Sequence, residues 1–376
     1  MRVVSGVVHR FEKLKPKMST YIPRYYDVGM NFSDDMFRGI YRDKPKHHND
    51  MDEILQRAKT FHVEKMLLTG SSLMESRWTL QQALKYKEEG LEDDDGLKMY
   101  PQLAATVGVH PCTVMEFEDN PESHLSQLRN LITEYSHTGL IRAIGEIGLD
   151  YDRLNYAPAD KQRVYFELQL KLACEFDLPL FLHMRSACDD FLDILIPFID
   201  HTRDDGLELK NKNCLVHSFS GTSQDLDRIL QHKSLRVSVN GCSLKTEENC
   251  RVASQIPLER LLLETDAPWC EIKRTHWSYQ YLTKCPSTFY PVDYNAEPLG
   301  REQPGTLHDF LRVPVLKPEK LDQFFLRKQY AFPPLVKGRN EPCMIGFVAQ
   351  VMSRLKNCDP DKLIEACYKN SEALFG

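Results

Sequence analysis

The sequence lacks three features that would each define a class of protein. It has no excess of positive charge, since its 376 residues give a formal net charge of −6. No global basic field therefore attracts nucleic acid, although a basic groove on one face is compatible with any net charge. It has no apolar run near the roughly 18 residues that span a bilayer, so we expect no membrane contact. Its eleven cysteines, from Cys112 to Cys367, include no C-x-x-C pair. Free thiols in the cytoplasm or nucleus are therefore expected, without a disulfide framework or structural zinc.

The amino-terminal segment differs in composition from the rest of the chain. Its first 17 residues contain five Lys or Arg and one acidic residue. This composition is compatible with a mitochondrial presequence. An upstream start with Met18 as an alternative initiator is the simpler interpretation. We therefore assign residues 1–24 to an N-terminal extension and residues 25–376 to a single domain, because closed α/β barrels commonly exceed about 200 residues.

Short apolar segments alternate with amphipathic segments along this domain. The eight apolar segments are residues 25–31, 63–70, 104–111, 141–148, 178–184, 214–220, 235–241 and 260–266. Between them, apolar residues recur three and four positions apart, as in 51–62, 160–177 and 186–199, which predicts helices. Eight strand–helix units with nearly continuous apolar strands predict an α/β fold of the (β/α)8 TIM-barrel type. An open, doubly wound sheet is the structural alternative.

Most of the predicted strands end in a polar residue. These residues are Asn31, His110, Glu146, His183, His217, Asn240 and Asp266. The C-terminal ends of the strands are where such barrels carry their active sites. The two carboxylates and the His183 and His217 imidazoles form a donor set suited to a divalent ion such as Mg²⁺, Mn²⁺ or Zn²⁺. For Glu146 the alternatives are a helix cap or an ion pair with Arg185, but an apolar run buries it, and an unpaired buried carboxylate is costly.

The segment LLLETDAPWC (261–270) contains two carboxylates with different expected roles. Strand alternation sends Glu264 and Asp266 to the same side, with Thr265 opposite. Only Asp266 reaches the rim, so it is the better metal ligand or general base. Glu264 is expected to orient a histidine or a neighbouring strand from behind.

Eight motifs recur through the predicted barrel and the C-terminal part of the chain: DVGMNFSD (27–34), VGVHP (107–111), GEIGLD (145–150), LHMR (182–185), HSFSG (217–221), NGCSLKT (240–246), LETDAPW (263–269) and RNEPC (339–343). Together they resemble the TatD family of metal-dependent deoxyribonucleases, in its eukaryotic form. The resemblance covers residues 25–270 and 339–376. It implies a barrel of the amidohydrolase-like, metallo-dependent hydrolase type and hydrolysis of DNA phosphodiester bonds, often as a 3′-5′ exonuclease. It also implies metal ligation by Glu146, His183, His217 and Asp266.

One motif departs from the pattern of many family members. Their first strand often ends in H-x-H, whereas this chain has Gly29 and Asn31 at those positions. One ion would then depend on Glu146, Asp266 and water. Oxygen ligands with retained waters favour Mg²⁺ or Mn²⁺, while an H-x-H site suits softer transition metals. We therefore expect one or two divalent ions, with Mg²⁺ ahead of Mn²⁺ and Zn²⁺.

The expected chemistry is in-line attack on phosphorus by a metal-activated water, with Asp266 and Glu146 as the catalytic carboxylates. The expected substrate contacts are His110, Arg185, Asn31 and Lys245. Three of them have an alternative: a hydrogen-bonded rim position for His110, an ion pair with Asp150 or Asp152 for Arg185, and a solvated loop position for Lys245.

Residues 271–340 break the repeating pattern. They contain eight prolines, eleven aromatic residues, and eleven Lys or Arg against seven Asp or Glu. We expect an insertion at about 271–338 beside the mouth of the barrel. Its basic residues and the aromatics Trp277, Tyr279, Tyr281, Phe324 and Phe325 suit base stacking. The alternative is a loop that covers the barrel surface.

Three functions fit these observations. The first is a metal-dependent deoxyribonuclease. The second is a barrel hydrolase acting on another ester, such as a D-aminoacyl-tRNA, because a fold alone does not choose a substrate. The third is a catalytically weakened nucleic-acid-binding protein, since Gly29 and Asn31 stand where imidazoles often do.

Overall fold

The computed structural model describes residues 21–90, 99–282, 288–290, 311, 313–327 and 333–376. Its main sheet has eight parallel strands in the order β1-β4-β5-β6-β7-β8-β9-β10. The strands are β1 Tyr25–Met30, β4 Val63–Leu68, β5 Gln102–Val107, β6 Ile141–Asp150, β7 Leu180–Arg185, β8 Cys214–His217, β9 Leu235–Val239 and β10 Leu261–Leu263. Each lies within or beside a predicted segment, so the prediction of eight strands is confirmed.

The sheet closes between its first and last strands. Met30 forms a parallel bridge with Ala267, and the Asp266 N–H donates to the Gly29 carbonyl at 2.8 Å. The Asn31 N–H donates in turn to the Ala267 carbonyl at 2.9 Å. The predicted TIM barrel is therefore confirmed, and the alternative of an open sheet is wrong.

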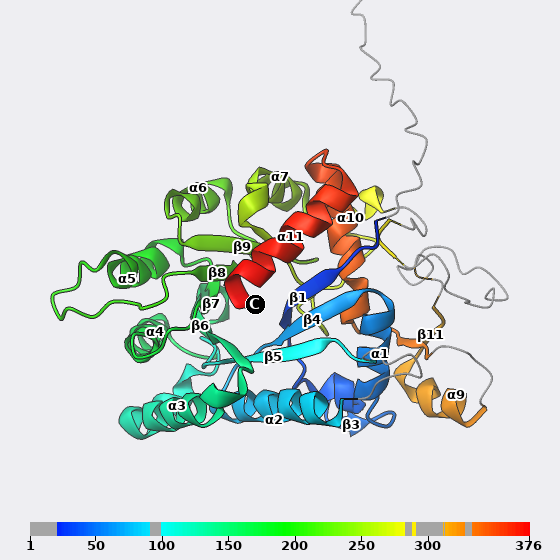
Figure 1. Cartoon of the computed structure of the whole chain (residues 1–376), viewed down its shortest axis with the longest axis horizontal. Coiled ribbons are helices and arrows are strands. Elements are labelled where there is room, and N and C mark those ends of the chain that lie inside the picture. The colour runs from blue at the N-terminus through cyan, green and yellow to red at the C-terminus, as the bar shows by residue number, and fades with distance from the viewer. Residues whose placement is uncertain (1–20, 91–98, 283–287, 291–310, 312, 328–332) are drawn as a thin grey trace, which may run out of the picture.

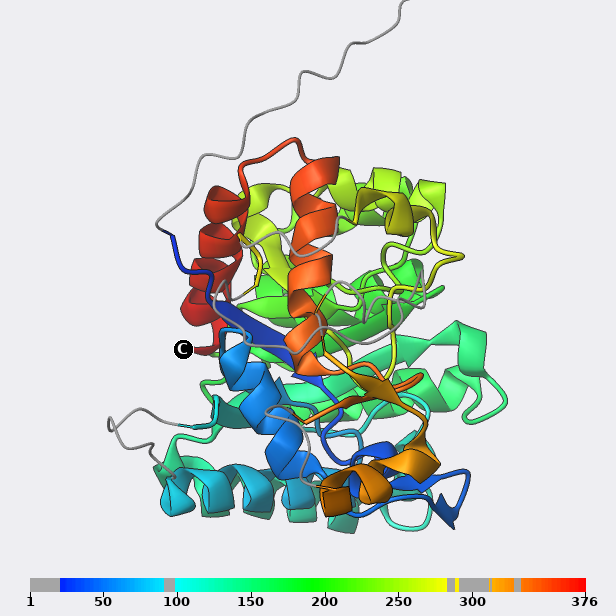
Figure 2. The same ribbon diagram turned by 90° about the vertical axis from the view of Figure 1, so that its right-hand side faces the viewer.

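A layer of helices surrounds the strands (Figures 1 and 2). These helices are α1 Met51–Thr60, α2 Leu73–Glu89, α3 Pro121–Tyr135, α4 Ala159–Ala173, α5 Cys188–Asp200, α6 Ser223–Gln231, α7 Glu247–Gln255 and α10 Ile345–Leu355. The predicted helices at 51–62, 160–177 and 186–199 correspond to α1, α4 and α5. Within the described residues, no helix is long and apolar enough to cross a membrane.

The last helix, α11 Pro360–Phe375, closes the N-terminal end of the barrel (Figure 1). Its Asn370 amide donates to the carbonyls of Leu258 and Leu261, where β10 begins. Three of its side chains join one apolar cluster with residues from the barrel strands. The cluster consists of Tyr26, Val28, Leu67, Ala104, Ala143, Phe181, Leu215, Leu262, Tyr368, Leu374 and Phe375.

This apolar cluster sets the direction of the residues above it. Because side chains alternate along a strand, His183, which follows Phe181 by two positions, also points into the barrel, one layer nearer the C-terminal end. The same spacing relates His217 to Leu215. The rings of Phe181 and His217 stack with their centroids 4.6 Å apart, so the apolar cluster is the floor of the polar mouth.

The predicted insertion is described in part. It contributes the turn at Trp277–Tyr281, the short helix α9 Leu321–Arg327, and the paired strands β11 Val315–Leu316 and β12 Leu335–Val336. A second short pair, β2 Ile40–Tyr41 and β3 Lys44–Pro45, follows β1. The predicted N-terminal extension lies almost entirely outside the described residues.

A buried ion network fastens the chain where it returns from the insertion. Arg339 Nη2 lies 2.6 Å from Asp50 Oδ2 and 2.8 Å from Glu341 Oε1, and Arg57 Nε lies 2.7 Å from Glu341 Oε2. All four residues are buried. The adjacent Asn340 amide donates to the carbonyls of Thr265 at 2.9 Å and Trp269 at 2.7 Å, which holds the loop that carries Asp266.

Candidate metal and catalytic site

Glu146 is the centre of the polar mouth. Its Oε1 lies 2.6 Å from His217 Nε2, 2.8 Å from His183 Nδ1 and 3.4 Å from His110 Nε2. Strands β6, β7 and β8 carry Glu146, His183 and His217, and His110 follows β5. Burial alone would raise the pKa of Glu146, but His217 and His110 outweigh it and hold that pKa well below its usual range. Glu146 is therefore an anion facing three imidazoles.

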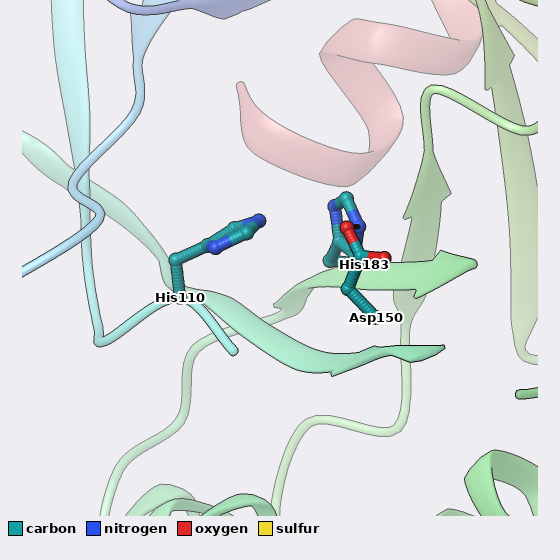
Figure 3. A group of neighbouring side chains, drawn as sticks. All are labelled: His110, Asp150 and His183. Carbon is teal, nitrogen blue, oxygen red and sulfur yellow. Dashed lines mark hydrogen bonds and ion pairs between the residues drawn. The ribbon is translucent and has the colours of Figure 1, made fainter. Parts of the chain in front are cut away.

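A second group of donors shares His183 with the first. His183 Nε2 lies 3.1 Å from Asp150 Oδ2, and the rings of His110 and His183 meet edge to face at 4.6 Å (Figure 3). The ligand atoms of His110, Asp150 and His183 all lie within 4.8 Å of one another, as do those of Glu146, His183 and His217. His183 thus presents one ring nitrogen to each group.

Asp150 was considered in the sequence only as an ion-pair partner of Arg185. Strand β6 extends to Asp150, two residues beyond the predicted segment, and carries its carboxylate to the mouth. A signal was present in the motif GEIGLD, where Asp150 follows Glu146 by four positions. Strand alternation places two such residues on one side.

Asp266 stands apart from both groups of donors. Its Oδ1 accepts from the Asn31 amide at 2.8 Å, and Cys270 Sγ lies 3.1 Å from its Oδ2. Removal from water raises the pKa of Asp266 to about 6, although His217 opposes the shift. Of the four predicted ligands, the structure brings Glu146, His183 and His217 together and directs Asp266 toward Asn31 and Cys270.

Glu264 lies behind His217, as its expected orienting role requires. Its Oε1 lies 3.5 Å from His217 Nδ1 and accepts from the Asn240 amide at 2.9 Å, while Oε2 accepts from the Ser238 hydroxyl at 2.7 Å. Burial lowers the pKa of His217, but Glu146 and Glu264 together raise it well above its usual value.

Glu264 also explains the glycine at the start of the barrel. A Cβ at Gly29 would lie only 2.9 Å from Glu264 Oε2, so the carboxylate occupies the space that a side chain there would need. The first imidazole of an H-x-H motif therefore has no room while Glu264 keeps this position. Asn31, at the second position, binds Asp266 instead.

The remaining predicted contacts occupy three different environments. Arg185 Nη1 lies 3.7 Å from Asp150 Oδ2, so the ion-pair alternative is the contact present in the structure. His110 Nδ1 accepts from the Cys112 N–H at 3.0 Å, which places its ring proton on Nε2, facing Glu146. Lys245 is exposed on the loop after β9.

The donor set fits a divalent metal ion. Glu146 and Asp150 both have lowered pKa values, because His217 and His110 outweigh burial at the first, and a hydrogen bond from His183 does so at the second. Ionised carboxylates beside imidazole nitrogens are a mixed oxygen and nitrogen set that such ions bind. The chemistry of these side chains and the barrel together support a divalent cofactor.

An eight-stranded barrel with converging carboxylates and imidazoles at its C-terminal end defines the class of metal-dependent hydrolases. The family model for TatD related DNase matches residues 27–376, and the chain belongs to that family.

Three relatives illustrate the match. Deoxyribonuclease Tat-D of Schizosaccharomyces pombe is 40% identical, covering 93% of this chain and 94% of the relative. The 3′-5′ ssDNA/RNA exonuclease TatD of Erwinia amylovora is 26% identical, covering 93% and 99%. The crystal structure of an uncharacterized amidohydrolase from Saccharomyces cerevisiae superposes with a TM-score of 0.78 at 37% identity, covering 94% of this chain and all of that one.

Proposed function

We propose that this protein is a divalent-metal-dependent deoxyribonuclease that hydrolyses phosphodiester bonds from the 3′ end of DNA. The observation that carries the proposal is the meeting of His183 Nδ1 and His217 Nε2 on one oxygen of Glu146. The names of the fission yeast and Erwinia relatives support DNA as substrate and an exonucleolytic direction.

The chemistry divides between the ion and the side chains. A divalent ion, when bound, supplies a Lewis acid that acidifies water and polarises a phosphoryl oxygen. Glu146, His183, His217 and Asp150 are the side chains that would hold it. Asp266 accepts the proton of the attacking water, because its raised pKa of about 6 leaves it ionised but basic near neutrality. Asn31 orients this carboxylate.

His110 is suited to donate a hydrogen bond to the substrate. Burial lowers the pKa of His110 to about 4, so the ring is neutral at pH 7. Since Nδ1 accepts from a backbone N–H, the Nε2 proton faces the site and can bind a phosphate oxygen or the leaving oxygen. Arg185, held beside Asp150, adds a guanidinium for phosphate, and Lys245 lies farther out as a second cation.

Two exposed indoles beside the mouth support a single-stranded substrate. Trp269 is 52% exposed, and its backbone N–H donates to the Asp266 carbonyl at 2.9 Å, so it stands in the same turn as the proposed catalytic carboxylate. Trp277 is 41% exposed, and its backbone is bonded to the Lys245 carbonyl at 2.8 Å. Indoles beside cations are the elements that bind unpaired bases and their phosphates.

We propose Mg²⁺ as the ion, with Mn²⁺ able to replace it, because carboxylate oxygens and Asn31 occupy positions where softer metals would find imidazoles. Metal-stripped protein would be assayed with Mg²⁺, Mn²⁺ and Zn²⁺ on 3′- and 5′-labelled DNA. Activity that survives EDTA, or returns only with Zn²⁺, would overturn the metal assignment. Parallel assays on RNA and D-aminoacyl-tRNA test the second function, a barrel hydrolase that acts on another ester.

The third function, binding without catalysis, needs a separate comparison. Asp266→Ala is expected to abolish hydrolysis while DNA affinity is retained. A wild-type protein that binds DNA but hydrolyses none of these substrates with any of the three ions would favour a binding protein.

A further inference from the structure

Two cysteines lie against each other beside Asp266. Cys242 is on the loop after β9, and Cys270 is on the loop after β10. The loops touch through their backbones, because a Cβ at Gly241 would lie 2.0 Å from the Cys270 carbonyl oxygen. The side chains of Cys242 and Cys270 interact with each other. Both residues are only partly buried, so small solutes can reach them.

The thiol pair is connected directly to the catalytic carboxylates. Cys270 Sγ lies 3.1 Å from Asp266 Oδ2. On the other loop, the Cys242 N–H donates to the Asn240 side chain at 2.8 Å, and the Asn240 amide donates to Glu264. A bond between the two sulfurs therefore acts on the proposed base through Cys270, and on the loop whose Asn240 holds Glu264.

We propose that Cys242 and Cys270 are an oxidisable dithiol that switches the hydrolase off. The inference rests on the proposed function for its effect, but not for its chemistry. The neighbouring Cys270 lowers the pKa of the Cys242 thiol, which favours Cys242 as the first sulfur to react. The described cysteines, including these two, are free thiols in the structure.

The oxidant is a peroxide, and the two steps balance. The Cys242 sulfur attacks one peroxide oxygen, the O–O bond breaks, and Cys242 becomes a sulfenic acid as water leaves. The Cys270 sulfur then attacks the Cys242 sulfur, the S–O bond breaks, and a second water leaves. In total two thiols lose two electrons and two protons to one hydrogen peroxide, which becomes two waters.

The product changes the environment of Asp266. A disulfide sulfur has no proton to donate, so Asp266 Oδ2 loses its contact with the Cys270 thiol. The bond also fixes the two loops to each other across the mouth. The expected result is about a tenfold loss of nuclease activity, the size of one lost hydrogen bond to a charged group.

The test uses the reduced, metal-supplied, full-length protein and hydrogen peroxide. We expect a single Cys242–Cys270 cross-link by peptide mass mapping, a parallel fall in DNA hydrolysis, and recovery of both on treatment with dithiothreitol. Cys242→Ser should keep the basal activity and resist peroxide. Cys358→Ser, which alters a partly buried cysteine between α10 and α11, should stay as sensitive as the wild type.

The outcomes separate this inference from the proposed function. A protein that forms the cross-link but hydrolyses no DNA even when reduced would support the dithiol proposal and overturn the proposed nuclease function. A nuclease that forms no such cross-link, or whose Cys242→Ser variant loses activity to peroxide as fast as the wild type, would overturn the dithiol. Cys112, also near the mouth, is a further control, because burial raises the pKa of its thiol to about 11 and keeps it protonated.

Discussion

The two ends of the barrel are built from the same strands and differ in what those strands present. At the N-terminal end, Leu262 and Phe181 pack against Phe375 of α11 in an apolar cluster. Two residues farther along the same strands, Glu264 and His183 lie in a buried polar layer. Two positions along a strand therefore separate the residues of the apolar cluster from those of the proposed active site. The comparison predicts that substitutions at one end change activity, and those at the other end change stability.

The largest effect is expected from Glu146→Gln at the polar end. A neutral amide cannot balance three imidazoles or bind a divalent ion as a carboxylate does, so kcat/KM should fall by about 10³-fold or more, in the range for loss of a central electrostatic group. Steady-state kinetics on single-stranded DNA, with the fold checked by circular dichroism, measure this change. Activity within tenfold of the wild type would remove Glu146 from the centre of the site.

The second prediction concerns a buried carboxylate at the seam between the first and last strands. Asp27 accepts from the Thr265 N–H at 2.9 Å and points away from the mouth. Burial raises its pKa to about 7. The folded state therefore holds the Asp27 carboxyl proton more tightly than the unfolded chain does. As the pH rises from about 4 toward 7, Asp27 lowers the free energy of unfolding.

Asp27→Asn should therefore become more stable relative to the wild type across that pH window, by up to about 4 kcal/mol, with activity unchanged at fixed pH. Urea unfolding of metal-free wild type and variant at a series of pH values measures the difference. Asp266→Asn is the contrasting variant, since it should abolish hydrolysis. A stability difference that does not vary with pH would mean that Asp27 is not protonated in the folded protein.

Much of this organisation could be predicted from the sequence, because its signals are local. The apolar segments located all eight strands, and the polar residues at the ends of most of them marked the mouth. Strand alternation also placed Glu264 behind a histidine. Asp150 was missed because its role depends on β6 continuing beyond residue 148.

Other features depend on contacts between distant segments. The direction of the Asp266 side chain depends on Asn31 and Cys270, and no spacing in the chain encodes those contacts. Helix α11 covers the N-terminal end of the barrel, and this surface exists only once the strands are assembled. The sequence shows Gly29 as a departure from the H-x-H motif. The reason for the glycine, that Glu264 Oε2 occupies the space beside it, is visible only in the folded structure.

The third prediction tests the apolar end. Phe375 is 2% exposed and lies in the cluster that α11 shares with the strands. Phe375→Ala should lower the free energy of unfolding by about 3 kcal/mol, as truncation of a buried aromatic ring does. The specific activity per folded molecule should stay within twofold of the wild type. Thermal unfolding and active-site titration measure the two quantities, and a large loss of specific activity would show that the two ends are coupled.

The smallest effect is expected at the rim, where the polar end meets solvent. Trp277→Ala should weaken the binding of single-stranded DNA by about tenfold, because one stacked base contributes on the order of 1–3 kcal/mol. Stability should hardly change, since this side chain is 41% exposed. Fluorescence anisotropy with labelled oligonucleotides and a catalytically inactive background gives the dissociation constant. Val164→Ala on the outer helix α4, where the side chain is 58% exposed, is the matched control and should bind as the wild type does. Equal affinities for all three proteins would instead mean that Trp277 only covers the barrel surface. The difference between the two ends would then be confined to the buried layer around Glu146.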